Sequence, residues 1–348
     1  MKKFNKIAMC TDIHFGRKNN SEVHNKDCLS YLDWFCDNVR NDPDIDAVCF
    51  LGDWHEHRAA VSGTTLHYSY MGAKKLNDLG IPVLFLAGNH DLVLRNKRDM
   101  FTTNPFDSLH NFTVIHEEPL VLEKNDAVIF PYLFEDEYHS LIPKYTNHSI
   151  FFGHFSFKGF VLTGESRINE HGPDHTVLKK LKRIFSGHFH KRQVKDNVAY
   201  IGNTFPADFG DANDFDRGMA TYNFNTDELN FINWVDCPKY IRSDLSKFLD
   251  KSVTLHKESR VIATVDLDLT FEDAMQLKQM LIKKYKLREL TFDEVEETNT
   301  LLKDTVVDIS HMESETTDTI VIEMLSQIES DQISSAKLVK IFEGLPCH

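Results

Sequence analysis

The sequence predicts an α/β protein built on parallel sheets, because short apolar runs alternate with helical patterns and polar side chains follow the runs. Strands are predicted first at residues 6–11, 47–51 and 82–87. Helices are predicted between them, at residues 25–40 and 64–78. A helix that connects two strands returns the chain to the same edge of the sheet, so this rhythm indicates parallel pairing.

A second sheet is predicted from four later apolar runs, at residues 127–130, 149–152, 183–185 and 198–201. The chain has 348 residues, of which 41% are hydrophobic, so it can bury a substantial core. A strand-rich stretch ends near Trp234, and the pattern changes at Pro238. We therefore expect residues 1–237 to form one large domain.

Residues 238–292 read as a small separate α/β unit. Its predicted elements are a strand, a helix and a second strand, at residues 260–267, 271–286 and 289–292. The helix should begin after Thr270, which forms a capping box with Asp273. Residues 293–318 are acidic and poor in large apolar side chains, which predicts a flexible linker. Residues 319–348 predict a tail of two short helices, at 319–328 and 334–343.

The net charge of -14 speaks at first against a nucleic-acid substrate, because DNA repels an acidic surface. The charge is concentrated at one end, however. Fourteen acidic and three basic residues lie between Glu289 and His348, a net charge of -11, which leaves -3 for residues 1–288. Two bound divalent cations would bring this larger part to about neutral or above.

The six cysteines are scattered and form no C-x-x-C pair, which is typical of reduced thiols in a cytoplasmic protein. The apolar run after the first lysines is too short for a signal sequence, and no stretch is long enough to cross a membrane. We therefore expect a cytoplasmic protein without a membrane partner.

Five polar clusters come directly after apolar runs. They are Asp12 with His14; Gly52 with Asp53; Gly88, Asn89, His90 and Asp91; Gly153 with His154; and Gly187, His188 and His190. Each cluster alone has an ordinary structural explanation: a strand-end turn for most, an Asx turn followed by a helix cap for residues 89–91, and a half-buried, hydrogen-bonded histidine for His154. Together they should converge, because the carboxyl ends of parallel strands form one crevice.

Carboxylate, imidazole and amide ligands without a thiolate suit Mn²⁺ or a similar cation, with Mg²⁺ as an alternative. Two such ions ~3.5–4 Å apart provide a nucleophile at neutral pH and relieve charge on phosphate oxygens. The clusters therefore predict a two-metal phosphoesterase, and a carboxylate between the ions would hold their spacing.

The ordered set D-x-H, G-D, G-N-H-D, G-H and G-H-x-H resembles the calcineurin-like metallophosphoesterase superfamily. Within it, the chain resembles SbcD-type nuclease subunits of double-strand-break repair complexes, and most closely the recombination nuclease subunits of T-even-like phages. Residues 152–160, 186–190 and 201–218 carry this closer similarity. The resemblance implies a four-layer α/β/β/α sandwich with a small DNA-capping domain and a helical tail.

The resemblance also implies the ligand sets. Asp12, His14, Asp53 and His190 would hold one ion, and Asp53, Asn89, His154 and His188 the other, so that Asp53 bridges. His90 would face the scissile phosphate and stabilise the transition state or protonate the leaving oxygen. The implied activities are duplex exonuclease and single-strand endonuclease. The implied partners are DNA and an SbcC-like coiled-coil ATPase bound by residues 319–348, with two nuclease chains in a heterotetramer.

Several basic and polar residues leave alternatives open. Relatives often carry His or Asp three residues after the bridging aspartate, where this chain has Glu56 between His55 and His57. Each of the three is either a DNA contact or a simple surface residue. Two basic groups are either solvated helix ends or DNA contacts: Lys179, Lys180, Lys182 and Arg183, and Lys283, Lys284, Lys286 and Arg288.

Two rival functions share these motifs. A phosphomonoesterase or protein phosphatase can use the same core, but protein phosphatases usually show G-N-H-E where residues 88–91 read G-N-H-D. An inactive scaffold would have lost ligands, whereas every ligand position here is filled. The motifs favour a DNA nuclease over both.

Overall fold

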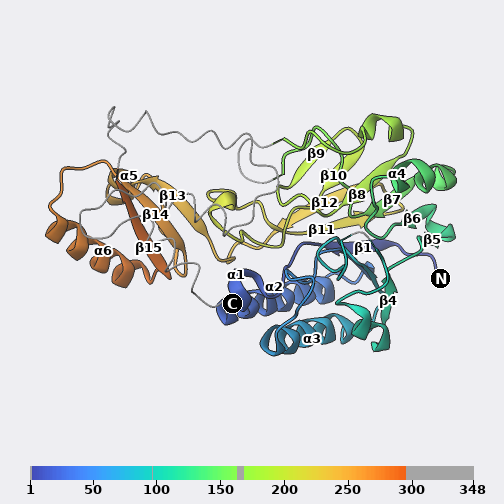
Figure 1. The fold of residues 1–348 in the computed structure, drawn as a ribbon, viewed down its shortest axis with the longest axis horizontal. Coiled ribbons are helices and arrows are strands. Elements are labelled where there is room, and N and C mark those ends of the chain that lie inside the picture. The colour runs from blue at the N-terminus through green and yellow to red at the C-terminus, as the bar shows by residue number, and fades with distance from the viewer. Residues whose placement is uncertain (1, 96, 163–167, 295–348) are drawn as a thin grey trace, which may run out of the picture. The chain divides into compact units, whose positions relative to one another are not determined.

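The structure is a computed structural model that describes residues 2–95, 97–162 and 168–294. Within these residues, one six-stranded sheet has the order β12-β11-β1-β2-β3-β4 (Figure 1). Its strands are β1 (Lys6–Cys10), β2 (Ile45–Leu51), β3 (Val83–Leu86), β4 (Phe112–Ile115), β11 (Gly218–Asn223) and β12 (Glu228–Asn233). The four from β1 to β4 are parallel, as predicted for the first three, and β11 and β12 extend the sheet in antiparallel fashion.

The second sheet among the described residues also has six strands, in the order β5-β6-β7-β8-β10-β9. They are β5 (Leu120–Leu122), β6 (Ala127–Ile129), β7 (Ile150–Gly153), β8 (Arg183–Ser186), β9 (Gln193–Lys195) and β10 (Val198–Tyr200). The four predicted strands pair in parallel at its centre, while β5 and β9 form antiparallel edges.

Three apolar clusters hold these layers together. Helices α2 (Glu22–Asn41) and α3 (Gly63–Asn77) cover the outer face of the first sheet, where Phe35 and Leu76 pack with Phe50. A second cluster lies between the sheets and contains Met9 and Phe152. The third covers the far side of the second sheet with a short helix, α4 (Glu137–Ser140), and 3₁₀ turns. The predicted α/β/β/α sandwich is confirmed, with a thin fourth layer.

Short elements connect the layers. A left-handed turn, α1 (Arg17–Asn20), follows β1. The 3₁₀ turns are η1 (Asn104–Ser108), η2 (Glu123–Asn125), η3 (Ile142–Tyr145), η4 (His175–Leu178) and η5 (Phe209–Asp211). Lys179 and Lys180 directly follow η4 and are exposed, as a solvated helix end would be. Arg183 differs, because it is the first residue of β8 and its Nε lies 3.2 Å from Asp227 Oδ1.

Beyond Pro238 the described chain forms a parallel three-stranded sheet in the order β13-β14-β15. Its elements are β13 (Tyr240–Asp244), α5 (Leu245–Leu249), β14 (Arg260–Val265), α6 (Phe271–Tyr285) and β15 (Glu289–Glu294). The predicted cap is present, since Thr270 Oγ1 accepts a hydrogen bond from Asp273 N at 3.1 Å. A separate apolar cluster with Val261 and Leu281 holds this sheet to its helices.

The predicted linker beyond Glu294 and the predicted tail helices lie outside the described residues. Five cysteines lie within them, and all five are buried and free: Cys10, Cys28, Cys36, Cys49 and Cys237. None of the helices in the described part combines the length and apolar character needed to cross a membrane.

Candidate metal centre

The seven candidate ligands all lie in loops that follow the carboxyl ends of strands. The positions are Asp12 and His14 after β1, Asp53 after β2, Asn89 after β3, His154 after β7, and His188 and His190 after β8. Because these strands run parallel within their sheets, the loops meet at one edge of the sandwich. The structure brings all seven side chains into two adjoining groups.

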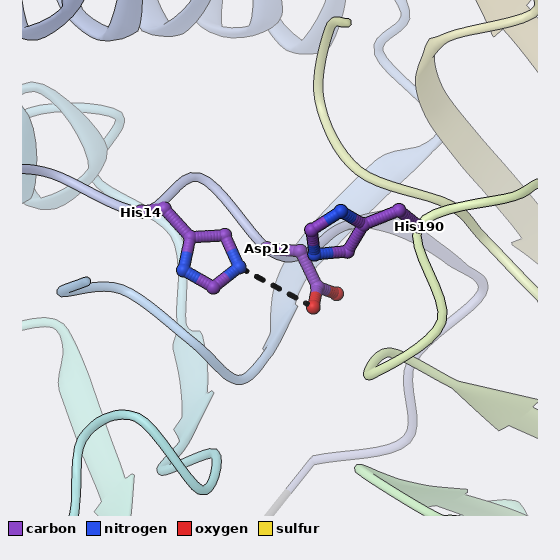
Figure 2. A group of neighbouring side chains, drawn as sticks. All are labelled: Asp12, His14 and His190. Carbon is purple, nitrogen blue, oxygen red and sulfur yellow. Dashed lines mark ion pairs between the residues drawn. The ribbon is translucent and has the colours of Figure 1, made fainter. Parts of the chain in front are cut away.

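The first group consists of Asp12, His14 and His190, whose ligand atoms lie within 4.8 Å of one another. Figure 2 shows the three side chains converging, with the His14 imidazole facing the Asp12 carboxylate. His14 Nε2 is 3.8 Å from Asp12 Oδ1. Both atoms are buried and have no hydrogen-bond partner among the described residues. A cation between these two atoms would give both a partner, because an imidazole nitrogen and a carboxylate oxygen are both metal ligands.

The second group consists of Asp53, His154 and His188, again within 4.8 Å. His154 Nε2 lies 3.2 Å from Asp53 Oδ2. Asn89 Oδ1 completes the group, at 3.0 Å from His154 Nε2 and 2.9 Å from His188 Nδ1. Asp53 Oδ2 is also 3.9 Å from His14 Nε2 in the first group. Asp53 is therefore positioned to serve both groups.

Carboxylates dominate the electrostatics of these groups. Burial opposes charge on His14, but its contacts with Asp12 and Glu56 outweigh this effect and raise its pKa to about 10. Burial also opposes charge on His154, yet the Asp53 carboxylate raises its pKa to about 9. Both shifts report a negative potential in the space between the side chains. Such a potential, lined with oxygen and nitrogen ligands, fits divalent cations.

The backbone at the candidate ligands is strained. Asp12, His14, Asp53 and His188 have φ values of 53°, 52°, 60° and 87°, in the left-handed region. This region is unfavourable for residues with a Cβ, by about 1–3 kcal/mol each, and such residues cluster at functional sites. The loops thus hold these side chains in conformations that local preference alone would not select.

Two motif glycines permit the close approach of the loops. A Cβ at Gly88 would lie 2.2 Å from Asp53 Oδ1, and one at Gly187 would lie 2.1 Å from Thr11 Oγ1. Any side chain at either position would push the strand-end loops apart. These glycines therefore serve the packing of the ligand loops on one another, which explains their place directly before ligand residues.

Asp91 joins the loops that follow β2 and β3 through hydrogen bonds. Its buried carboxylate accepts hydrogen bonds from the backbone N–H groups of Trp54, His55 and Gly88, at 2.9 to 3.2 Å. Burial raises the pKa of Asp91 to about 6, although these hydrogen bonds oppose the rise. The last residue of the G-N-H-D motif therefore connects the β3 loop to the β2 loop by hydrogen bonds.

His90 lies beside both groups and is half-buried. Its backbone N–H donates to Asp53 Oδ1 at 2.8 Å, and its ring Nδ1 donates to the Glu56 carbonyl at 2.8 Å. Its ring centroid is 5.0 Å from that of His14. With Nδ1 engaged by a carbonyl, the Nε2 side of the ring remains available to a substrate.

The sequence left open whether His55, Glu56 and His57 are DNA contacts or simple surface residues, and the structure places the three differently. His55 is buried and structural, because its ring nitrogens lie 2.8 Å from Thr102 Oγ1 and 2.7 Å from Ser69 Oγ. His57 is exposed and lines a cleft beside His90. Glu56 is part of the site.

Glu56 connects the candidate ligands to a second layer. Its Oε2 lies 2.9 Å from His14 Nδ1 and 3.9 Å from Arg17 Nη1. Arg17 Nη2 in turn lies 2.6 Å from Asp208 Oδ2. A carboxylate behind a ligand histidine fixes its tautomer and makes the other ring nitrogen a better donor to a cation. Sequence reasoning left the role of Glu56 open because spacing does not reveal which way a loop side chain faces.

Tyr132 was missed in the sequence. Its ring centroid lies 6.1 Å from that of His154 and 6.2 Å from that of His188. It follows β6 just as the candidate ligands follow their strands, so the same strand-end rule applied to residues 127–130 would have found it.

Replacing the second-layer carboxylate, Glu56→Gln, is expected to weaken Mn²⁺ binding by a factor of about 10–100, because the neutral amide no longer makes the other ring nitrogen of His14 a stronger donor to a cation. Isothermal titration calorimetry with Mn²⁺ would measure the change. Glu123→Gln, at an exposed position, is the matched control and should bind like the unaltered protein. Equal affinities for all three proteins would contradict the role given to Glu56.

Comparisons with known proteins agree on the family. The family model described as calcineurin-like phosphoesterase matches residues 5–192, which include all seven candidate ligands. Exonuclease subunit 1 of Enterobacteria phage T4 is 27% identical over 238 residues, covering 65% of this chain and 68% of that protein.

Three solved structures that resemble this chain have sequence identities of 10%, 16% and 12%. A dimetal phosphatase from Danio rerio has a TM-score of 0.40 at 10% identity, over 64% of this chain and 93% of that chain. Nuclease MPE of Pseudomonas putida has a TM-score of 0.30 at 16% identity, over 63% of this chain and 85% of that chain. Purple acid phosphatase PPD1 of yellow lupin, Lupinus luteus, has a TM-score of 0.37 at 12% identity, over 66% and 53%.

Proposed function

Because the chain belongs to the calcineurin-like phosphoesterase family, we propose that it is a two-metal DNA nuclease, the catalytic subunit of a recombination and repair complex. The observation that carries the proposal is the position of Asp53, whose Oδ2 lies 3.2 Å from His154 Nε2 and 3.9 Å from His14 Nε2. One carboxylate between two imidazole-containing groups is what a pair of neighbouring cations requires. The 27% identity to a phage exonuclease subunit supports DNA as the substrate.

Seven residues would bind the cations, and an eighth would donate a proton. Asp12, His14, Asp53 and His190 would hold one cation, and Asp53, Asn89, His154 and His188 the other, with Mn²⁺ the best match to the mixed ligand set and Mg²⁺ the alternative. When bound, the cations supply a nucleophile at neutral pH and relieve charge on the phosphate oxygens. His90 faces the scissile phosphate and provides a proton to the leaving oxygen from its Nε2 side.

A comparison of substrates tests this function. With Mn²⁺, the protein should cleave end-labelled duplex and single-stranded DNA and leave p-nitrophenyl phosphate largely intact. Rapid hydrolysis of the phosphomonoester with intact DNA would identify a phosphatase instead. Absence of activity on both, with no bound metal at micromolar supply, would indicate a scaffold.

The three-stranded sheet beyond Pro238 is proposed to help position duplex DNA. Lys283, Lys284 and Lys286 are exposed at the end of α6 and offer charge to the phosphate backbone. Arg288 does not share that role, because its guanidinium lies 2.5 Å from Asp27 Oδ2 and 2.9 Å from Glu258 Oε2. Replacing the three lysines by alanine should therefore reduce the affinity for duplex DNA; unchanged affinity would contradict this role.

We propose a homodimer within a heterotetramer that also contains an SbcC-like ATPase. Exposed apolar side chains on α2 and α3, namely Val23, Leu66, Tyr70 and Met71, support contact between two nuclease chains. Sedimentation of a monomer at micromolar concentration would contradict the dimer.

Residues 319–348 are proposed to bind the ATPase, because the two short helices that their sequence predicts would need an apolar partner surface. Deleting residues 318–348 should abolish binding to the ATPase and preserve metal-dependent cleavage of short single-stranded DNA. A pull-down and a gel-based nuclease assay measure the two effects. A truncated protein that still binds the ATPase tightly would contradict the assignment.

A further inference from the structure

A cleft of about 830 Å³ opens directly beside His90. Three loops line it: the left-handed turn α1 contributes Asn19, the loop after β2 contributes Glu56 and Arg58, and the loop after β3 contributes His90 and Arg95. Since His90 and Glu56 belong to the site already described, the cleft is a continuation of that site along the surface.

Two arginines on this cleft, Arg58 and Arg95, have no hydrogen-bonding or ion-pair partner in the part of the chain that the structure describes, and Arg58 is half-buried. Their neighbours differ, since Arg17 pairs with Asp208 and Arg98 pairs with Glu137. A guanidinium left free on a concave surface is suited to a phosphate, which it can bind through two parallel hydrogen bonds.

The acidic group among the lining residues does not neutralise these arginines. Glu56 is directed to His14 Nδ1 at 2.9 Å, with Arg17 as its other cationic neighbour at 3.9 Å. The cleft therefore has an excess of positive charge although the whole chain carries -14. Positive charge beside a hydrolytic site attracts an anionic polymer such as a nucleic-acid strand.

A strained turn also lines the cleft. Lys18, Asn19 and Asn20 are consecutive residues with φ of 56°, 54° and 59°, a left-handed run that L residues rarely adopt. It is held by Asn20 N donating to the Gly16 carbonyl at 2.8 Å and by Thr65 Oγ1 donating to Asn20 Oδ1 at 2.9 Å. The turn puts Asn19 on the cleft, where its amide has no hydrogen-bond partner among the described residues.

We propose that this cleft is a subsite for the nucleic-acid strand on the leaving-group side of the scissile bond, with Arg58 and Arg95 bound to its flanking phosphates. The inference rests on the proposed nuclease function and on His90 facing the leaving oxygen. Asn19 adds hydrogen bonds to the sugar-phosphate backbone. The described lining offers two guanidinium groups and no Phe, Tyr or Trp, so the proposal assigns its main contacts to phosphates.

The subsite predicts that substrate length matters. Bis(p-nitrophenyl) phosphate is a phosphodiester that reaches the candidate metal groups but has no flanking phosphate, whereas a single-stranded thymidine oligonucleotide fills the cleft. In the double variant Arg58→Ala with Arg95→Ala, KM for the oligonucleotide should rise by about tenfold for each arginine removed. The kcat and KM for bis(p-nitrophenyl) phosphate should stay within about twofold.

Salt dependence provides a second readout. The slope of log KM for the oligonucleotide against log salt concentration should flatten by about 1.4, because each phosphate of a single strand that an arginine no longer neutralises lowers the slope by about 0.7. Arg58→Lys with Arg95→Lys keeps the charges and should retain most of the slope. Arg40→Ala with Lys124→Ala removes the same charge from exposed positions outside the cleft and should change neither KM nor slope.

The outcomes separate the subsite from the proposed function. An unaltered protein that cleaves neither diester would overturn the nuclease function, whereas one that cleaves both, with no change in the double alanine variant, would overturn the subsite alone. Equal losses on both diesters would also overturn it. Binding of a fluorescein-labelled oligonucleotide, followed by anisotropy, tests the subsite without cleavage: affinity equal to that of the unaltered protein would contradict it. Thermal unfolding of each variant confirms that the fold is retained.

Discussion

Asp53→Asn is expected to abolish phosphodiester cleavage, with kcat reduced by a factor on the order of 10³ or more. The Asp53 carboxylate lies between the two groups of candidate ligands, so the substitution removes a charge that the two proposed cations would share. The fold should persist, because an asparagine Oδ1 can still accept the hydrogen bond that His90 N donates at 2.8 Å. Cleavage of DNA in Mn²⁺ and circular dichroism on heating are the measurements.

The control for this prediction is Asp136→Asn, which makes the same change at an exposed position and should cleave normally. An Asp53→Asn protein that retained most of its activity would show that the two groups do not depend on a shared carboxylate. Loss of the folded state would shift the explanation to stability, so the thermal measurement accompanies every rate.

His90→Ala is expected to lower turnover by a factor of about 10²–10⁴ while bound metal persists. The physical reason is that His90 donates its Nδ1 hydrogen to the Glu56 carbonyl and keeps its other ring edge for the substrate. Removing the ring therefore removes a proton donor and leaves the ligands in place. The measurements are kcat on DNA and Mn²⁺ content by elemental analysis.

A ligand role is the alternative for His90, because its ring also lies near His14 and Glu56, within 4.8 Å of their ligand atoms. Loss of metal from His90→Ala would favour that alternative. His110→Ala removes an exposed imidazole and should preserve both metal content and turnover.

The alternation of strands and helices could be predicted where the strands are buried on both faces and the helices on one. β1, α2, β2, α3 and β3 appeared in the sequence because apolar runs of the right length are separated by helical periodicity. β4 was not predicted, since its first three residues are only partly buried and an edge strand has a weak pattern. β13 was missed for a similar reason, because exposed Arg242 interrupts its apolar positions.

The composition of the candidate site was readable because its residues follow strands, and parallel strands bring their ends together. The sequence could not show which way each loop side chain faces. Nothing in the run from Asp53 to His57 distinguishes Glu56, which reaches His14, from His55, which faces inward to Ser69. The left-handed turn at Lys18 to Asn20 was equally hidden, since contacts with Gly16 and Thr65 select it against local preference.

The central claim is that two cations share Asp53 and together permit DNA cleavage, and a single titration tests it most directly. Metal-free protein is titrated with Mn²⁺ while bound Mn²⁺ is counted by electron paramagnetic resonance and cleavage of end-labelled DNA is followed in the same samples. The account predicts two bound ions per chain, with cleavage rising as the second ion binds. Full cleavage with one ion bound, or two ions bound without cleavage of DNA, would contradict it.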